Sequence, residues 1–217
     1  MLTKKGALFA GFIFTVFLFA ACEQKSKTVL PKPDSIRIPV AFNDSSILSI
    51  DKSPMDMSYF PEDYPKQKMI TPDMPNPVAR VIYSRPKKNG RVIFGDSTVK
   101  ENVIQRFGQE WRLGANEATE IEFFKPVNIN GKNLAAGRYI MYCIPSPDSW
   151  KIIFNTNLYS WGLHFDRTKD IAEIDLPIIK NDVSIEYFTL LCQRAGGGFE
   201  IVMAWGDMKA LLPVKIN

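Results

Sequence analysis

The chain has 217 residues, 46% of them apolar, which is enough for one globular domain of ordinary size with additional segments. Its net charge is +4, but two of the 27 basic residues, Lys4 and Lys5, lie in an N-terminal leader without acids, so the rest is close to neutral. A neutral body argues against nucleic acid as a partner and against binding to acidic membranes by charge alone.

Residues 1–21 have the pattern of a signal peptide. Lys4 and Lys5 form a short positive region, and a fifteen-residue apolar run follows over residues 7–21. A membrane-spanning helix needs roughly 20 apolar residues, so this run is short for a permanent span and fits the hydrophobic region of a signal peptide.

The apolar run ends in Phe19-Ala20-Ala21-Cys22, which resembles a bacterial lipobox except that Phe19 stands where an aliphatic residue is usual. We therefore expect Cys22 to be lipidated, with palmitate or a similar acyl chain, and the lipid bilayer to be a partner through it. The alternative is an ordinary secretory signal with Cys22 incidental. No acidic cluster follows Cys22, so we expect a protein that is lipid-anchored in the cell envelope and faces the periplasm.

Residues 22–52 are predicted to be a tether that lifts the folded domain off the bilayer. The segment is polar and without sustained periodicity, and Pro31, Pro33 and Pro39 exclude a helix. The folded domain is expected over residues 53–217.

Residues 55–64 are predicted to form an extended N-terminal arm against the folded body. Aromatic and methionine side chains are too dense here for a solvated linker. Tyr59, Phe60 and Tyr64 would cover a sheet edge that is otherwise exposed. The alternative is that the arm shapes one wall of a pocket.

From residue 78 onwards, short apolar runs recur at intervals of about ten residues, divided by turn signals such as Asn89-Gly90 and Asn130-Gly131. This spacing predicts an all-β fold, an antiparallel β-sandwich of about ten strands, in which residues 161–165 form one short strand. No long helical pattern alternates with the strands, which argues against a parallel α/β fold.

One short helix is expected at residues 98–110. Thr98 can cap its start, Val103 and Phe107 fall on one face, and Gly108 would end it.

Two cysteines remain beyond Cys22, and both lie in strand-like runs. An exported protein occupies a compartment where disulfides persist, so Cys143 and Cys192 are candidates for a bridge. We expect instead two buried free thiols, because nothing in the sequence fixes their relative position.

Several short motifs stand in the order and rough spacing of one bacterial family. They are Ser53-Pro54-Met55-Asp56, Tyr83-Ser84-Arg85-Pro86, Gly90-Arg91, Ile93-Phe94-Gly95, Trp111-Arg112-Leu113-Gly114-Ala115-Asn116-Glu117-Ala118-Thr119, Gly131-Lys132, Ala136-Gly137-Arg138-Tyr139, Ile144-Pro145, Trp150, Ile153-Phe154-Asn155 and Trp161-Gly162. From about residue 53 to 216 the chain resembles the family catalogued as domain of unknown function (DUF) 2911. The resemblance implies a secreted, often lipid-anchored β-sandwich, and it implies no reaction. Residues 97–110 look longer and more helical than the corresponding loop of the family.

The ligand-binding candidates are the polar and aromatic residues of these motifs: Arg85, Arg91, Trp111, Arg112, Asn116, Glu117, Thr119 and Trp161. In a ligand site, the guanidinium groups would grip a carboxylate or phosphate and a tryptophan would stack on a sugar ring. Glu117 and Asn116 would orient hydroxyl groups.

The architectural alternative uses the same residues to hold a corner of the fold. Arg112 or Arg91 would pair with Glu117, Asn116 would sit at a positive-φ turn, and Thr119 would cap the start of a strand.

Enzyme functions receive little support. His164 is the only histidine, which excludes sites with several histidine ligands, and we expect neither a metal nor a cofactor. The sequence contains no Gly-x-Ser-x-Gly motif and no P-loop.

Three classes of function stay open. The first is a non-catalytic module for a small polar ligand or glycan. The second is a structural or assembly lipoprotein that acts through protein contacts. The third is a carboxylate-dependent hydrolase that uses Glu117 with Glu120, Glu122 or Asp166.

Overall fold

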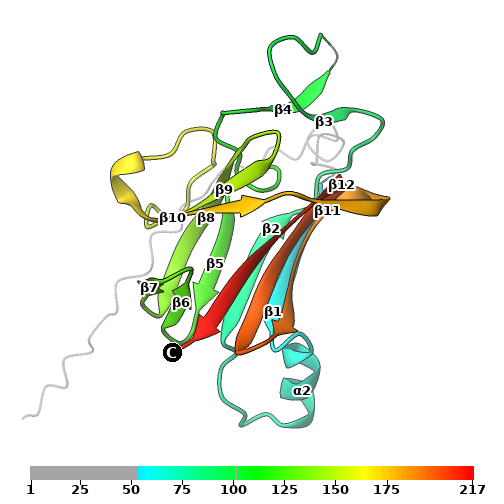
Figure 1. Cartoon of the computed structure of the whole chain (residues 1–217). Coiled ribbons are helices and arrows are strands. Elements are labelled where there is room, and N and C mark those ends of the chain that lie inside the picture. The colour runs from blue at the N-terminus through cyan, green and yellow to red at the C-terminus, as the bar shows by residue number, and fades with distance from the viewer. Residues whose placement is uncertain (1–52, 101) are drawn as a thin grey trace, which may run out of the picture. The chain divides into compact units, whose positions relative to one another are not determined.

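A computed structural model of the chain describes residues 53–100 and 102–217, which form mostly β-strands (Figure 1). In chain order the elements are β1 (Met55–Phe60), α2 (Tyr64–Ile70), β2 (Ala79–Ser84), β3 (Val92–Gly95), β4 (Val103–Arg106), β5 (Thr119–Phe123), β6 (Val127–Ile129), β7 (Lys132–Leu134), β8 (Gly137–Pro145), β9 (Ser149–Asn155), a 3-10 turn η1 (Arg167–Lys169), β10 (Asp170–Pro177), β11 (Ile179–Ala195) and β12 (Gly198–Ile216). The predicted all-β class is confirmed, with twelve strands in the described ranges where about ten were expected.

The predicted signal peptide, Cys22 and the tether lie outside the described residues. Within the described ranges, no helix is both long and apolar enough to cross a membrane.

The strands form two antiparallel sheets. The larger sheet has the order β1-β2-β5-β8-β9-β10, and the smaller has the order β11-β12-β6-β7. β11 and β12 are a long hairpin of 17 and 19 residues whose register shifts between Lys180 and Thr189. A separate pair, β3 and β4, is parallel. β1 is therefore a terminal strand of the larger sheet, and β11 is a terminal strand of the smaller one.

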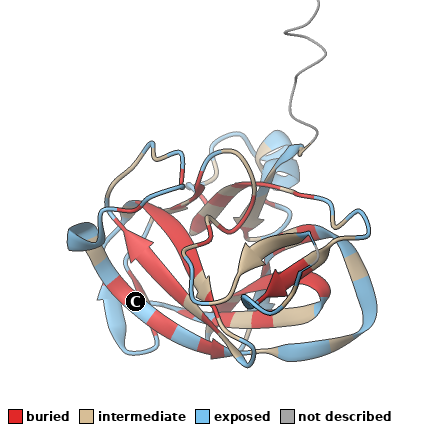
Figure 2. Ribbon diagram, turned by 90° about the horizontal axis from the view of Figure 1, so that it is seen from above, coloured by how far each residue is buried: buried red, intermediate tan, exposed pale blue. Residues whose placement is uncertain are grey.

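The core lies between the two sheets and follows the two-residue period of the strands. In β10, for example, Ala172, Ile174 and Leu176 are buried while their neighbours face outwards. Figure 2 shows this alternation as red and paler bands along the strands. The centre of the core is an aromatic cluster with neighbouring ring centroids 5.0 to 5.9 Å apart, made of Phe94, Trp111, Trp150, Phe188 and Trp205.

A second, smaller apolar cluster lies on the outer face of the larger sheet. Residues 156–166 form a loop, which we call the aromatic loop, over this face. Phe165 of the loop stacks on Tyr142 of β8 with ring centroids 4.0 Å apart, next to Ile140 and Ile153. The prediction of a strand at 161–165 is wrong, because this segment packs through single side chains and joins neither sheet.

The predicted helix at residues 98–110 is also wrong. Val103 instead begins β4, which pairs with β3, and Phe107 stacks on Phe94 with centroids 6.1 Å apart. Val103 is β-branched and packs against Gly95, where an added Cβ would lie 3.1 Å from its Cγ2. Tertiary pairing with β3 thus overrides a helical spacing of apolar residues.

The predicted arm at residues 55–64 is extended as far as Phe60. It is itself the edge strand β1 of the larger sheet, whereas we expected it to cover an edge. The observed helix, α2, follows directly, with Pro65 in its first turn and Tyr64 buried.

Cys143 and Cys192 are both buried free thiols, so the expectation of no bridge is confirmed. Burial raises the pKa of Cys143 well above its ordinary value and the pKa of Cys192 to about 12. Neither thiol is therefore a nucleophile at neutral pH.

Candidate functional site

Residues 111–119, which we call the signature segment, form a tight corner leading into β5. Trp111 exchanges backbone hydrogen bonds of 2.7 and 2.8 Å with Cys143 of β8, and its indole lies in the core. The Thr119 hydroxyl donates to the Leu113 carbonyl at 2.6 Å. An added Cβ on Gly114 would lie 2.8 Å from the Ser84 carbonyl oxygen, so only glycine fits at this corner.

The signature segment also holds the aromatic loop in place. The Arg112 guanidinium donates to the carbonyl of Asn116 and, at 3.0 Å, to that of Trp161. The Ala118 backbone N–H donates to the Ser160 carbonyl at 3.2 Å. Gly162 packs so closely that an added Cβ would lie 2.7 Å from the Cβ of Arg112.

The other end of the aromatic loop is fixed by a polar cluster around Asp170. Its carboxylate accepts hydrogen bonds from Tyr142, Asn155 and Arg167 at 2.7 to 3.0 Å. Burial, followed by the bond to Asp170, raises the pKa of Tyr142 well above its ordinary value, so this phenol stays a neutral donor. The loop is therefore anchored at both ends.

Between its anchors the aromatic loop exposes apolar side chains. Tyr159 is 79% exposed, Trp161 58% and Leu163 60%. The Arg138 guanidinium of β8 donates to the Tyr159 hydroxyl at 2.5 Å, and its carbon lies 5.3 Å from the centre of the Tyr159 ring. These contacts hold the Tyr159 ring beside Arg138 of the larger sheet.

A pocket of about 260 Å³ lies beside Tyr159, and we call it the carboxylate pocket. Tyr159 and Ser160 of the aromatic loop line it, together with Glu117 and Glu120. Arg138 pairs with Glu120 at 3.5 Å. The rest of the lining is Met55 of β1, three residues of β2 (Ile82, Tyr83 and Ser84), Ala118, and Ile140 of β8.

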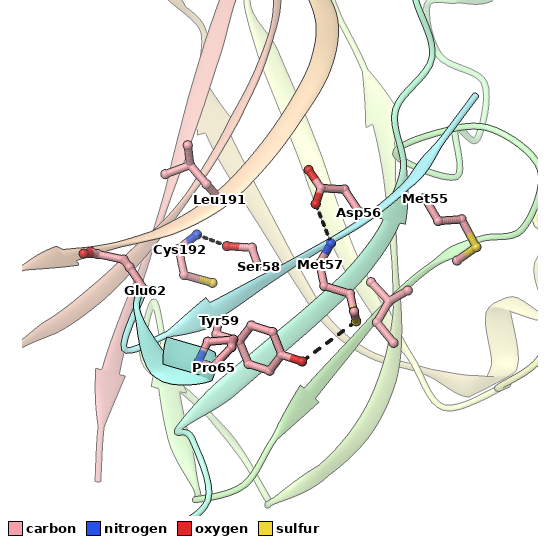
Figure 3. Close-up of a pocket in the computed structure, with 10 residues that line it drawn as sticks. Met55, Asp56, Met57, Ser58, Tyr59, Glu62, Pro65, Leu191 and Cys192 are labelled. Atoms are coloured by element: carbon pink, nitrogen blue, oxygen red, sulfur yellow. Dashed lines mark hydrogen bonds between the residues drawn. The ribbon is translucent and has the colours of Figure 1, made fainter. Parts of the chain in front are cut away.

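A larger groove of about 770 Å³, the edge groove, shares Met55 and Ile82 with the carboxylate pocket and follows β1 (Figure 3). Its opposite wall is Leu191 and Cys192 of β11. The lining is mainly apolar, and the Asp56 carboxylate accepts a hydrogen bond from the Met57 N–H at 2.8 Å.

Side chains close the seam between β1, β2 and β11 on its inner side. The Cys192 N–H donates to the Ser58 hydroxyl oxygen at 2.8 Å, and the Arg194 N–H donates to the Glu62 carboxylate at 2.6 Å. The Leu190 N–H is hydrogen-bonded to the Tyr83 hydroxyl, which opposes the rise in the Tyr83 pKa caused mainly by burial.

Arg85 clamps one end of this seam. Its guanidinium pairs with Asp56 at 3.2 Å and donates to the Phe188 carbonyl and the Thr189 hydroxyl. The side chain thereby ties β1 and β11 together.

The structure disperses the eight predicted candidates. Trp111 and Thr119 lie in the core, so a ligand at the surface does not reach them. Arg91 donates to the carbonyls of Lys87 and Lys88, away from Arg85 and Arg112, so the three guanidinium groups do not converge on one anion.

Among the remaining candidates, Glu117 lines the carboxylate pocket. Asn116, at φ 63°, forms the turn just before it, and the exposed Trp161 directly follows Ser160 of the lining. Sequence reasoning did not single out Tyr159 and Ser160. The one available signal was an aromatic residue next to Trp161-Gly162, in a segment that we assigned to no strand.

Comparison with known proteins gives one match. The family described as "Protein of unknown function (DUF2911)" matches residues 65–214. No curated protein and no solved structure matches the chain.

Proposed function

The chain belongs to the DUF2911 family, whose description assigns no activity, and we propose that it is a non-catalytic lipoprotein module that binds one sugar unit of a glycan in the carboxylate pocket. One observation carries the proposal: a tyrosine and two glutamates, Tyr159, Glu117 and Glu120, line the same small pocket.

This combination suits a sugar. A tyrosine ring offers a flat apolar face for the C–H groups of a pyranose, and ionised carboxylates accept strong hydrogen bonds from hydroxyl groups. Drug-sized ligands occupy pockets of roughly 300–1,000 Å³, so a volume of about 260 Å³ fits a ligand of one ring. Arg138 orients both the Tyr159 ring and the Glu120 carboxylate, so the pocket is preorganised.

The anchoring part of the proposal rests on sequence. Lys4 and Lys5, the apolar run over 7–21 and the Ala20-Ala21-Cys22 junction support export and acylation of Cys22. Replacing Cys22 by serine should move the protein from the membrane fraction to the soluble fraction. A variant that stays membrane-bound and uncleaved would contradict lipid anchoring.

Sugar binding can be tested directly on the purified full-length protein. A thermal-shift screen of neutral and N-acetylated hexoses and their oligomers should give at least one stabilising ligand, and calorimetry should then give its affinity. Glu117→Gln and Tyr159→Ala should each weaken binding at least tenfold, about 1.4 kcal/mol. Glu200→Gln, which alters a carboxylate of the other sheet, is the matched control and should leave affinity unchanged.

A screen without any stabilising sugar would overturn the proposed function. Binding that survives both Glu117→Gln and Tyr159→Ala would place the sugar elsewhere.

A hydrolase is the second candidate, because two carboxylates on one pocket are also what glycoside hydrolysis requires. One of the two residues, Glu120, already pairs with Arg138 at 3.5 Å, which favours a binding role. We expect no release of reducing ends from oligosaccharides that bind. Release that is lost in both Glu117→Gln and Glu120→Gln would favour the hydrolase.

A further inference from the structure

Strand β1 presents an open edge. Within the described residues it ends the larger sheet and pairs on one side only, with β2. The Arg85 N–H donates to the Pro54 carbonyl, and the register sets Met55 opposite Ser84. In an antiparallel ladder, backbone groups alternate in direction, so Met55, Met57 and Tyr59 direct theirs away from β2.

The edge groove runs along this open edge. Five consecutive residues of β1, from Met55 to Tyr59, line it. Successive side chains of a strand point to opposite faces, so a cavity that contacts all five lies beside the strand and not on one face. Figure 3 shows these side chains, with Leu191 and Cys192 across the groove.

Strand β11 forms the opposite wall without occupying the edge of β1. Its N–H groups at Leu190, Cys192 and Arg194 are bound by side chains of β1, β2 and the residue Glu62. These bonds hold the two strands a side chain apart, which leaves the outward backbone groups of β1 accessible from the groove.

A row of backbone donors and acceptors repeats every two residues, about 6.6–6.8 Å along a strand. Another extended main chain matches that repeat, whereas a small ligand does not. The walls suit its side chains, since Met55 and Met57 are 63% and 54% exposed and methionine adapts to different apolar shapes.

We propose that the edge groove binds an extended polypeptide segment with alternating apolar side chains, which adds to β1 as a further strand. Asp56 acts as the cap of the empty edge. One carboxylate oxygen accepts the Met57 N–H while the other stays paired with Arg85. An incoming strand replaces the first contact and leaves the second in place.

The first test compares two peptides on the full-length protein in mild detergent by fluorescence anisotropy. The probe is a fluorescein-labelled peptide of nine alternating valine and threonine residues flanked by lysines. The second peptide carries N-methyl groups on two adjacent residues near its centre, which blocks hydrogen bonding on both of its edges. The N-methylated peptide should bind at least tenfold more weakly.

A matched pair of variants tests the edge of the protein. Met57→Pro removes an N–H that takes no part in the ladder with β2, and proline is tolerated at such edge positions. It should weaken peptide binding at least tenfold, whereas Met57→Leu, which keeps the backbone and an apolar side chain, should not. Glu117→Gln should also leave peptide binding unchanged, since Glu117 does not line the edge groove.

Amide hydrogen exchange on the unaltered protein gives an answer even if Met57→Pro fails to fold. Saturating peptide should slow exchange at Met57 and Tyr59 at least tenfold, while Asp56 and Ser58, already paired with β2, should not change. Equal binding of both peptides, no peptide binding, or unchanged exchange would overturn the proposal. Strong protection at Met57 and Tyr59 before peptide is added would also overturn it, because the chain itself or a second copy would then occupy the edge.

Discussion

The signature segment and the aromatic loop are in contact, but they use their side chains in opposite ways. The signature segment places Trp111 in the core at 4% exposure and bonds Thr119 to its own backbone. The aromatic loop leaves Trp161 58% exposed, and both of its ends are anchored. A corner whose side chains are buried and bonded within the fold thus supports a loop whose apolar side chains are exposed.

A distinctive motif can identify a family or form a site, and this contrast separates the two roles. Residues 111–119 carry the resemblance to the family, yet most of their bonds are internal to the fold. Glu117 alone among their charged or aromatic side chains lines the carboxylate pocket. Residues 111–119 therefore identify the scaffold, whereas the aromatic loop carries the exposed Tyr159, Trp161 and Leu163.

The two regions should differ most in how much the loss of their tryptophan lowers the stability of the fold. Trp111→Ala should lower the free energy of unfolding by about 3–5 kcal/mol, because it empties the centre of the aromatic cluster. Trp161→Ala is the matched control and should change it by no more than about 0.5 kcal/mol. Urea unfolding followed by circular dichroism measures both. Similar losses of stability in the two variants would refute the distinction between the buried signature segment and the exposed aromatic loop.

A smaller effect is expected where the two regions touch. Gly162→Ala should lower the free energy of unfolding by about 1–3 kcal/mol, since φ is +79° and the new Cβ would lie 2.7 Å from the Cβ of Arg112. Amide exchange should become faster across residues 156–166 and remain slow in β5. Gly197→Ala is the control for backbone strain alone, with φ +77° and no heavy atom within 4 Å. If both substitutions cost the same, the close packing of loop and corner contributes nothing.

The smallest effect near neutral pH concerns the two buried thiols, Cys143 and Cys192. Iodoacetamide at pH 8 should label neither Cys143 nor Cys192 in the folded protein and both after denaturation. Burial raises the folded pKa of Cys192 from 9.0 to about 12, so the unfolded chain loses this proton first as pH rises. The contribution of Cys192 to stability is complete below pH 9.0 and declines between there and about pH 12.

Unfolding measured at pH 7 and pH 10 should therefore show a decline that is smaller in Cys192→Ala. An equal decline in the two proteins would contradict this assignment. Rapid labelling of Cys143 in the native state would show instead that the bridge to Trp111 opens.

Strand positions follow closely from local patterns. Alternating residues such as those of β10, and the turn at Asn130-Gly131, depend on period and turn chemistry that a short window contains. The segment around β4 has apolar residues at helical spacing, and its pairing with β3, in which Val103 lies opposite Val92, makes it extended. The helical period within the segment gives no sign of that pairing.

The candidate site was harder to predict than the fold. Trp111 and Trp161 are both tryptophans beside polar residues, and their opposite exposures depend on long-range packing. The same is true of Arg85, Arg91 and Arg112, whose acceptors are mostly backbone carbonyls that any sequence supplies. Glu117 lines the carboxylate pocket and Trp161 is 58% exposed, whereas Tyr159, which the sequence did not single out, became visible only with the fold.

The seam between β1 and β11 has a consequence for the order of folding. The hydrogen bond from Cys192 to Ser58 joins residues 134 apart, and Lys215, two residues from the end of the chain, pairs with Asn128 of β6. Contacts of such long separation close late, because their loop entropy must be overcome first. The smaller sheet pairs β6 with β12 and is therefore completed only once β12 has been made, whereas all strands of the larger sheet precede residue 178.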